Sequence, residues 1–360
     1  MTRREQQLLR WIAENPMISQ QELADKAGIT RSSTAVHISN LMKKGAILGK
    51  GYILRTAPYT VVAGGVNIDI GGTADRALVA ADSNPGRVRT SLGGVGRNIA
   101  HNMALLGMDV RLVTALGDDA NGQRIRRSCG ELGIDLSRTL NVVGGSTSTY
   151  LFISDERGEM VLALSDMEIY QALTPTYLAT LGSFLNGAQL VIADTNLPAS
   201  SLAWLAEHVK VPLFVDPVST MKAEKLWPIL GKIHTLKPNR LEAQLLSGIS
   251  ITDENSLHRA TDRLLAAGLH RVFISLGPDG VLAADQNSRF HLPCCPGRAI
   301  NATGCGDAFM AALAWSWLEG LELEETARTG LAGASIALEG ADTINSNMNA
   351  EALRKKARIG

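Results

Sequence analysis

The run from Asn301 to Asp307 has the residue types that a phosphoryl-transfer site would need. It reads Asn-Ala-Thr-Gly-Cys-Gly-Asp, and the apolar residues after it predict a helix that begins near Asp307. Free backbone N–H groups at a helix N-terminus attract negative charge, and Gly304 and Gly306 leave theirs unobstructed. A carboxylate fits there if it accepts a proton from an attacking hydroxyl while the amides hold the charge on the transferred phosphoryl group. The alternative is a glycine C-cap followed by an aspartate N-cap, and this run alone does not decide between the two.

Two upstream segments could hold a substrate beside that helix. Gly93 and Gly94 precede a predicted helix containing Asn98, whose amide can donate to and accept from vicinal hydroxyls. The G-x-G pattern there has no acidic residue at the spacing of a dinucleotide-binding fold, so we discount that function. Asp69 follows the first predicted strand, where α/β proteins hold ligands, although by itself it could equally be a turn or N-cap residue.

From Tyr59 onward, short apolar strands alternate with amphipathic helices. Strands are predicted at 60–63, 110–115, 190–193, 213–215, 233–236 and 272–276, and helices at 97–106, 201–208 and 253–267. This alternation indicates a largely parallel sheet with helices on both faces. Residues of about 74–91 and 146–165 are predicted to be extended β segments that form a lid over the strand ends.

Residues 1–56 are predicted to be a separate helical unit. Leu8 and Ile12 share a helical face that stops before Pro16, Ser19 and Glu22 form a capping-box pattern, and Thr30 caps a third helix at about 31–44. Apolar stretches at 46–48 and 52–54 predict a two-stranded wing, and 56–58 a linker. The unit resembles the winged helix-turn-helix of bacterial transcription factors, which implies DNA contacts from the third helix. The exposed face of that helix is predicted to contain Arg31, Ser32, Ser33, Thr34, His37 and Asn40.

The charge distribution agrees with that interpretation. The chain has 360 residues and no net charge, but residues 1–56 contain nine Lys and Arg against four Asp and Glu, a balance of +5 that leaves −5 for the rest. A basic segment on an acidic body suggests that the two parts meet different partners. The alternative for residues 1–56 is a packing or oligomerisation module whose charges are simply solvated.

Composition excludes several other classes of protein. No run of apolar residues is long enough for a membrane span, and the N-terminal residues lack the apolar core of a signal peptide. The four cysteines contain no C-x-x-C pair, which argues against a disulfide framework or a zinc site. We therefore expect a cytoplasmic protein that does not interact with membranes.

The segments 93–107 and 301–309 resemble the two signatures of the ribokinase family, also called the phosphofructokinase-B carbohydrate kinases. The resemblance spans residues 59–350 and implies a ribokinase-like three-layer α/β/α sandwich with a small β lid over residues 57–360. It also implies ATP-dependent phosphorylation of a hydroxyl group, with Asp307 as the base. The anion hole would be formed by Gly304, Cys305 and Gly306, and the substrate hydroxyls would be bound by Asp69, Gly93, Gly94 and Asn98.

The same resemblance assigns the nucleotide site. The run from Lys237 to Glu242 is similar to the family's N-x-x-E motif, in which Glu242 would hold Mg²⁺ through water. Without the resemblance, Glu242 would pass as an exposed residue at a helix start. ATP would be bound by Asn239, Ser275, Gly277 and Gly280.

Two residues depart from the family pattern. Asn301 stands where most members have Asp, at a position that commonly helps to hold a monovalent cation. A K⁺ site would comprise Asn301, Thr303, Gly340 and Ser346, with one charge fewer than usual. Cys305 replaces the usual Ala and is either a passive small residue or a thiol whose pKa is lowered at the helix N-terminus.

The lid resembles that of pseudouridine kinases. Thr149 and Asp166 would bind the nucleoside and Met167 would pack on the base, although Asp166 could instead face solvent and Met167 belong to the core. Only Arg97 stands near the substrate loops, so a neutral substrate is favoured over a sugar phosphate. We therefore predict phosphorylation of a nucleoside 5′-hydroxyl, with pseudouridine first and inosine or cytidine second. The alternatives are a kinase that acts on a free pentose or hexose, and a transcription regulator that senses a sugar or nucleoside.

The exposed edge of the lid predicts a homodimer.

Overall fold

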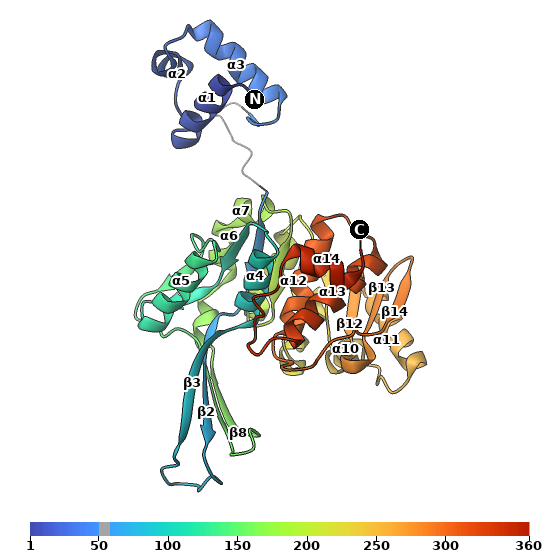
Figure 1. The fold of residues 1–360 in the computed structure, drawn as a ribbon. Coiled ribbons are helices and arrows are strands. Elements are labelled where there is room, and N and C mark those ends of the chain that lie inside the picture. Colours follow the sequence, from blue (N-terminus) through green and yellow to red (C-terminus); the bar gives the residue numbers. More distant parts are fainter. Residues whose placement is uncertain (50–57, 360) are drawn as a thin grey trace. The chain divides into compact units, whose positions relative to one another are not determined.

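The computed structural model describes residues 1–49 and 58–359, and it divides into two compact units, Met1–Pro58 and Tyr59–Gly360. Each unit has its own apolar core. Figure 1 shows the helices of the first unit and the sheet, helices and lid of the second.

The first unit is a bundle of three helices: α1 (Arg3–Glu14), α2 (Gln20–Ala27) and α3 (Arg31–Lys43). Ser19 and Glu22 form the predicted capping box at the start of α2, and Gly28 ends that helix with a φ of 63°. Glu5 is buried and its carboxylate pairs with Lys44 at 2.7 Å, which ties α1 to the end of α3. Leu8, Ile12 and other apolar side chains of the three helices form the core of the unit.

The face of α3 is less exposed than predicted, and the clearest difference is at Thr34. Thr34 is buried, and its hydroxyl donates to the carbonyl of Thr30, so it is not part of the exposed face. Arg31 and Ser32 are exposed, whereas Ser33, His37 and Asn40 are half-buried. Ile47 forms a β-bridge, which fits the first strand of the predicted wing. The second wing strand, and all of the predicted linker except Pro58, lie outside the described residues.

The second unit is built on an eight-stranded sheet with the order β14-β13-β12-β11-β10-β9-β1-β4. Six neighbouring strands are parallel, and β13 and β14 continue the sheet antiparallel at one edge. The strands are β1 (Thr60–Ala63), β4 (Val110–Val113), β9 (Val191–Asp194), β10 (Leu213–Asp216), β11 (Thr235–Leu236), β12 (Arg271–Ser275), β13 (Val281–Asp285) and β14 (Arg289–Leu292).

Alternate residues of the strands enter two apolar cores, one on each face of the sheet. Val61 and Val191 belong to one core, and Val62 and Ile192 to the other. Fully apolar strands are expected where helices cover both faces of a parallel sheet. The molecule therefore has the predicted three-layer α/β/α architecture.

Different helices cover the two faces. One core receives side chains from η1 (Glu168–Ala172), α6 (Pro175–Thr180), α7 (Gly182–Asn186), α8 (Ala199–His208), α9 (Thr220–Ala223), η2 (Glu224–Lys232), α10 (Arg240–Ser247) and α11 (Glu254–Ala266). The other receives side chains from α4 (Val95–Leu105), α5 (Ala120–Glu131), α12 (Cys305–Leu318), α13 (Leu323–Leu338) and α14 (Ala350–Ala357). A short turn of helix, η3 (Gly277–Asp279), joins β12 to β13.

A second sheet, with the order β3-β2-β7-β8, forms the lid and projects from the body (Figure 1). Its strands are β2 (Asn67–Ala74), β3 (Gly86–Gly93), β7 (Thr149–Ser154) and β8 (Met160–Asp166). The predicted extended segment at 74–91 was placed too far along the chain. Residues 75–85 have no regular strand, and the central lid strand is β2, which already begins at Asn67.

A short parallel pair, β5 (Ala115–Gly117) and β6 (Leu140–Val142), completes the strands of the described chain. Among the described residues, no helix combines the length and the apolar character that a membrane crossing requires.

Candidate active site

Asp307 lies in the first turn of α12, which begins after Gly304. Gly304 has a φ of 83°, and a side chain there would come within 2.3 Å of the carbonyl oxygen of Thr343. Only glycine combines that backbone conformation with so close an approach. The turn that starts the helix therefore fixes where the Asp307 carboxylate points.

Asn98 holds that carboxylate in place. The Asn98 amide nitrogen donates to Asp307 Oδ2 at 2.8 Å, from the neighbouring helix α4. The other amide atom, Asn98 Oδ1, is buried without a hydrogen-bond partner in the described chain. Asn98 was predicted to bind substrate hydroxyls; in this structure one of its two N–H donors serves Asp307, which leaves the other donor and the acceptor Oδ1 for a substrate.

The environment of Asp307 makes it a stronger base than an ordinary carboxylate. Burial raises the pKa of Asp307 to about 8, and the negative charge of Asp216 adds to the increase. The hydrogen bond from Asn98 and the charge of Lys237 act in the opposite direction and lower this pKa. A carboxyl group with a pKa near 8 is suited to accept a proton from an alcohol, because a general base works best near the operating pH.

Three backbone amides near Asp307 are free to bind an anion. The described residues provide no acceptor for the amides of Gly304, Gly306 and Asp307. The Cys305 amide, by contrast, donates to the carbonyl of Ala302 at 3.3 Å, so it is the least available member of the predicted anion hole. Unpaired amides at the N-terminus of a helix form an anion site.

The Cys305 thiol is not activated. Burial and the nearby Asp307 carboxylate raise its pKa to about 11, so the thiol stays protonated at neutral pH. The alternative of a lowered pKa at this position is therefore wrong, because the thiol lies beside a negative charge as well as a helix N-terminus. Cys305 acts as a passive small residue between the two glycines.

Charged side chains also gather at the carboxyl ends of three neighbouring strands. Asp194 ends β9, Asp216 ends β10, and Lys237 follows β11. Lys237 Nζ lies 3.1 Å from Asp216 Oδ2, and both side chains are buried. Burial raises the pKa of Asp194 to about 6, although its carboxylate accepts from the backbone N–H groups of Gly65 and Asn196. Sequence reasoning placed the strands but did not assign these residues, whose position after a predicted strand was the available signal.

The N-x-x-E motif forms a helix cap in this structure. Asn239 caps α10 by accepting from the Glu242 amide, and Glu242 Oε2 accepts from the Asn239 amide at 2.8 Å. Glu242 is 3 % exposed, so the view of it as an exposed helix-start residue is wrong. Burial and the charge of Asp216 raise the pKa of Glu242.

The predicted ATP-binding turn lies next to that cap. Ser275 forms a β-bridge with Asn239, and the Leu276 amide donates to the carbonyl of Gly280. Gly277 and Gly280 have φ values of 64° and 89°, and a side chain at Gly280 would collide with the carbonyl of Leu292. The structure therefore brings the four predicted ATP-binding residues to adjacent strand ends.

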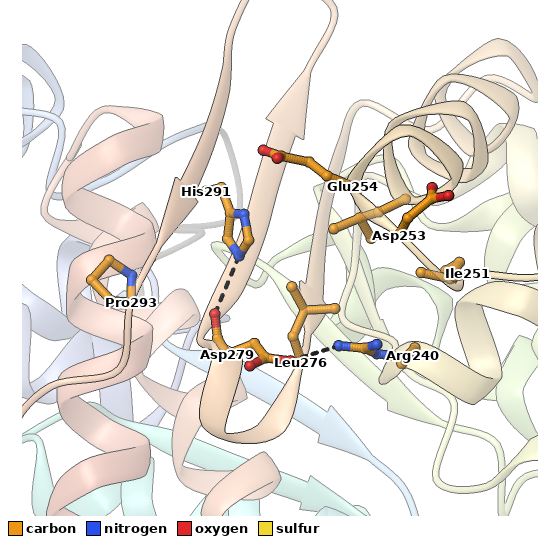
Figure 2. A pocket seen from close by; sticks show the side chains of 9 residues that line it. Arg240, Ile251, Asp253, Glu254, Leu276, Asp279, His291 and Pro293 are labelled. Atoms are coloured by element: carbon orange, nitrogen blue, oxygen red, sulfur yellow. Dashed lines mark hydrogen bonds and ion pairs between the residues drawn. The ribbon is translucent and has the colours of Figure 1, made fainter.

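A pocket of about 490 Å³ opens beside the predicted ATP-binding turn (Figure 2). The pocket is lined by Arg240, Ile251, Asp253, Glu254, Leu257, Leu276, Asp279, His291 and Pro293. Arg240 pairs with Asp279 at 2.8 Å and ties the start of α10 to the turn, while His291 Nε2 lies 3.2 Å from the Asp279 carbonyl oxygen. This pocket contains neither Asp307 nor Asn98.

The remaining hydroxyl-binding residues meet at the base of the lid. Asp69 accepts from the Asn67 side chain at 2.6 Å, and burial raises its pKa. A side chain at Gly93 would lie 2.1 Å from Asp69 Oδ2, and one at Gly94 would collide with the carbonyl of Gly65. These two glycines therefore let the segment before α4 approach Asp69 and the loop after β1.

Two lid residues predicted to bind a nucleoside, Thr149 and Asp166, do not share the face of Asp69. Thr149 pairs with Ile68 and Asp166, whereas Asp69 pairs with Tyr150. Because successive strand residues point to opposite faces, Thr149 and Asp166 lie on the face opposite Asp69. Asp166 is exposed in this structure, and Met167 packs against a core.

Other lid residues do share the face of Asp69. Tyr150 and Phe152 lie on that face, with ring centroids 5.9 Å apart, and sequence reasoning missed them as candidates. Register also places Arg89 and Arg87 there, so Arg97 is not the only arginine near the lid. These two arginines line a pocket with Asp75 and Glu156 near the tip of the lid.

The predicted K⁺ loops lie side by side. The Asn301 side chain donates to the Ala341 carbonyl at 3.1 Å and accepts from the Thr303 amide at 2.9 Å. Both ends of this amide are therefore occupied within the protein, while Thr303 and Ser346 are exposed and Gly340 is half-buried. Among the described residues, no group of three or more His, Cys, Asp and Glu side chains is arranged to hold a metal ion.

Comparison with known proteins agrees with this geometry. Residues 57–350 match the pfkB family carbohydrate kinases, and residues 1–47 match a winged helix-turn-helix DNA-binding family. An uncharacterised sugar kinase of Escherichia coli K12 is 39% identical over 353 residues, which covers 98% of each chain. The pseudouridine kinase of the same organism is 40% identical over 299 residues, covering 82% of this chain and 95% of its own.

Solved structures show the same fold. A putative sugar kinase from Clostridium perfringens has a TM-score of 0.76 at 31% identity, and it covers 84% of this chain and 96% of its own. Arabidopsis thaliana ribokinase, solved with ribose and ATP, also has a TM-score of 0.76, at 24% identity, and covers 85% of this chain and 100% of its own. The chain is thus a phosphotransferase that acts on an alcohol group, and it belongs to the pfkB family of carbohydrate kinases, with a winged helix-turn-helix unit at its N-terminus.

Proposed function

We propose that this protein transfers the γ-phosphoryl group of ATP to the 5′-hydroxyl of a nucleoside, with pseudouridine as the favoured substrate. The observation that carries the chemical part is the Asp307 carboxylate, held by Asn98 beside the free amides at the start of α12. The substrate hydroxyl loses its proton to Asp307 and its oxygen forms a bond to the γ-phosphorus. The bond between that phosphorus and the β–γ bridging oxygen breaks, and ADP leaves with the electron pair.

The residues present are suited to Mg²⁺. Glu242 and Asp216 are both buried carboxylates, and the charge of Asp216 raises the pKa of Glu242, so a divalent cation beside them would relieve this repulsion. Glu242 Oε2 is used by the helix cap, so Glu242 would contribute its other oxygen, through water. Bound Mg²⁺ would supply charge neutralisation for the phosphates of ATP, and Asn239, Ser275, Gly277 and Gly280 would hold the nucleotide itself.

The preference for pseudouridine is supported by similarity and by the lid. Identity is 40% to a pseudouridine kinase, against 29% to a ribokinase and 25% to a guanosine-inosine kinase. Tyr150 and Phe152 give the face of Asp69 an aromatic surface on which a base could stack. Thr149, Asp166 and Met167 do not contribute to that aromatic surface in this structure.

A substrate panel tests this proposal. ADP formation is measured with pseudouridine, uridine, inosine, cytidine, ribose, fructose and a sugar phosphate, each over a range of concentrations. We expect the highest kcat/KM with pseudouridine and lower values with the other nucleosides. Turnover of ribose or fructose at higher efficiency than every nucleoside would contradict the nucleoside assignment and leave only the kinase activity.

We also propose that residues 1–56 bind DNA, since residues 1–47 match a DNA-binding family and α3 exposes Arg31 and Ser32. In the complex with DNA, the half-buried residues Ser33, His37 and Asn40 would lie at the edges of the contact that α3 makes. A regulator that only senses its ligand would bind DNA without phosphorylating any member of the panel. Gel-shift assays with and without nucleoside therefore separate this alternative from an enzyme that has a DNA-binding unit.

A further inference from the structure

The buried side chain of Lys237, near Asp307, has no role in the function proposed above. Lys237 is 6 % exposed and follows the short strand β11, where its backbone N–H donates to the carbonyl of Val215. A side-chain carbon placed on Gly306 would lie only 3.3 Å from Lys237 Nζ. The ammonium therefore reaches the first turn of α12, beside the free amide of Gly306.

The bonding of Lys237 leaves room for a ligand. Within residues 1–49 and 58–359, Asp216 is the single ion-pair partner of its ammonium, at 3.1 Å. An ammonium has three N–H donors, so two are left for an anion. Lys225 shows the contrasting pattern, because its ammonium donates to the carbonyls of Thr195 and Leu197 and stabilises the backbone.

The surrounding charges keep Lys237 protonated. Asp216, Glu242 and Asp307 raise the pKa of Lys237 although burial acts to lower it. A buried, permanently charged ammonium next to free helix amides is an arrangement that favours a phosphoryl group over a neutral ligand.

We propose that Lys237 is a further catalytic residue, whose ammonium binds the oxygens of the γ-phosphoryl group while that group moves to the hydroxyl deprotonated by Asp307. This inference rests on the proposed kinase reaction and deepens it. Lys237 remains protonated throughout, so the atom and electron balance of the transfer is unchanged. Asp216 is a positioning residue that holds the ammonium before ATP binds.

Steady-state kinetics of Lys237→Met, Lys237→Arg and the double variant Asp216→Asn/Lys237→Met test this role. Loss of one donor to a developing charge typically costs about 10²–10³ in kcat, and we expect that loss in Lys237→Met, with little change in KM for the acceptor. Lys237→Arg keeps the charge and should recover part of the activity. Lys225→Met removes a half-buried lysine that bonds to backbone carbonyls and serves as the control, and its kcat should stay close to that of the wild type.

The double variant distinguishes a catalytic role of Lys237 from a purely structural one. Removing one partner of a buried ion pair leaves an uncompensated charge, whereas removing both does not. If Lys237 only neutralised Asp216, the double variant would be no slower than Asp216→Asn alone, and the proposal would be overturned. If Lys237 acts on the phosphoryl group, the double variant folds normally and is slower than Asp216→Asn alone by a factor similar to that lost in Lys237→Met.

Two further measurements do not depend on that comparison. Because Lys237 lowers the pKa of Asp307, the acidic limb of the pH–rate profile should move to higher pH in Lys237→Met. Binding of ADP with and without aluminium fluoride, in the presence of Mg²⁺, needs no acceptor and so tests Lys237 even if every nucleoside fails. We expect Lys237→Met to lose affinity for the fluoride complex and to keep its affinity for ADP. Equal losses for both ligands would overturn the inference.

Discussion

At the scale of single residues, the site depends on the pKa and the orientation of the Asp307 carboxyl group. The side chain is half-buried, and desolvation together with the negative charges of Asp216 and Asp194 raises its pKa to about 8. Asn98 orients the carboxyl group with one hydrogen bond. Both features follow from the packing of α4 against α12, so neither could be predicted from the local sequence around Asp307.

Thermal unfolding tests the raised pKa of Asp307. An unfolded aspartate has a pKa near 4, so folding at a pH between about 4 and 8 takes up a proton, and stability from this residue is lost as the pH rises through that range. Asp307→Asn is neutral at every pH and escapes this loss. We expect the Tm of Asp307→Asn to exceed that of the wild type by about 3 °C or more at pH 8. The difference should shrink toward pH 5, and a difference independent of pH would contradict the raised pKa.

Asn301 gives a second prediction for a single residue. Its amide group already links the Ala341 carbonyl to the Thr303 amide, so we expect the kcat of the wild type to be similar in KCl and in choline chloride. Asn301→Asp replaces the donor with a carboxylate facing the Ala341 carbonyl, and a cation would then be needed between them. Its kcat should fall in choline chloride and recover in KCl. Strong K⁺ activation of the wild type would instead favour the predicted cation site.

At the scale of elements, the sequence predicted the main sheet better than the lid. Continuous apolar runs predicted the buried strands β1, β9, β10 and β12 to within two residues at each end. The lid strand β2 was missed because Gly71 and Gly72 look like loop residues. Gly71 is needed there because a side chain would collide with the Phe152 ring. The faces of the lid depend on strand register, which the sequence alone did not fix.

An exposed apolar face of the lid indicates that the protein forms a dimer. The face opposite Asp69 exposes apolar side chains, including Val88 at 70 % and Leu164 at 63 % exposure. We propose that a second copy covers this face. Leu164→Asp should convert a dimer to a monomer in sedimentation velocity, whereas Val143→Asp, at a still more exposed apolar site outside the lid strands, should not. A wild-type protein that stays monomeric at micromolar concentration would rule this interface out.

At the scale of the whole molecule, the two units have separate cores and separate family matches. Composition predicted this division, because the basic balance is confined to the first residues. How the units influence each other could not be predicted, since coupling depends on contacts that neither composition nor motif spacing encodes.

DNA binding by the first unit can be measured with the full chain and a pool of random-sequence duplexes. Arg31 is exposed at the start of α3, and we expect Arg31→Ala to weaken binding and to reduce the salt dependence by about one phosphate contact. Lys355→Ala removes an exposed charge from the second unit and serves as the control. Equal affinity of wild type and Arg31→Ala would show that this face of α3 does not contact DNA.

The most direct test of the central claim is the kcat of Asp307→Asn with ATP and the acceptor that performs best in the panel, measured across pH. Loss of a general base typically costs about 10²–10⁴ in rate, and we expect a decrease of that size with an unchanged KM for the acceptor. The kcat/KM of the wild type should rise with pH through about 8, since Asp307 acts as a base only when deprotonated. Near-normal kcat in Asp307→Asn, with the same pH dependence as the wild type, would remove Asp307 from the mechanism.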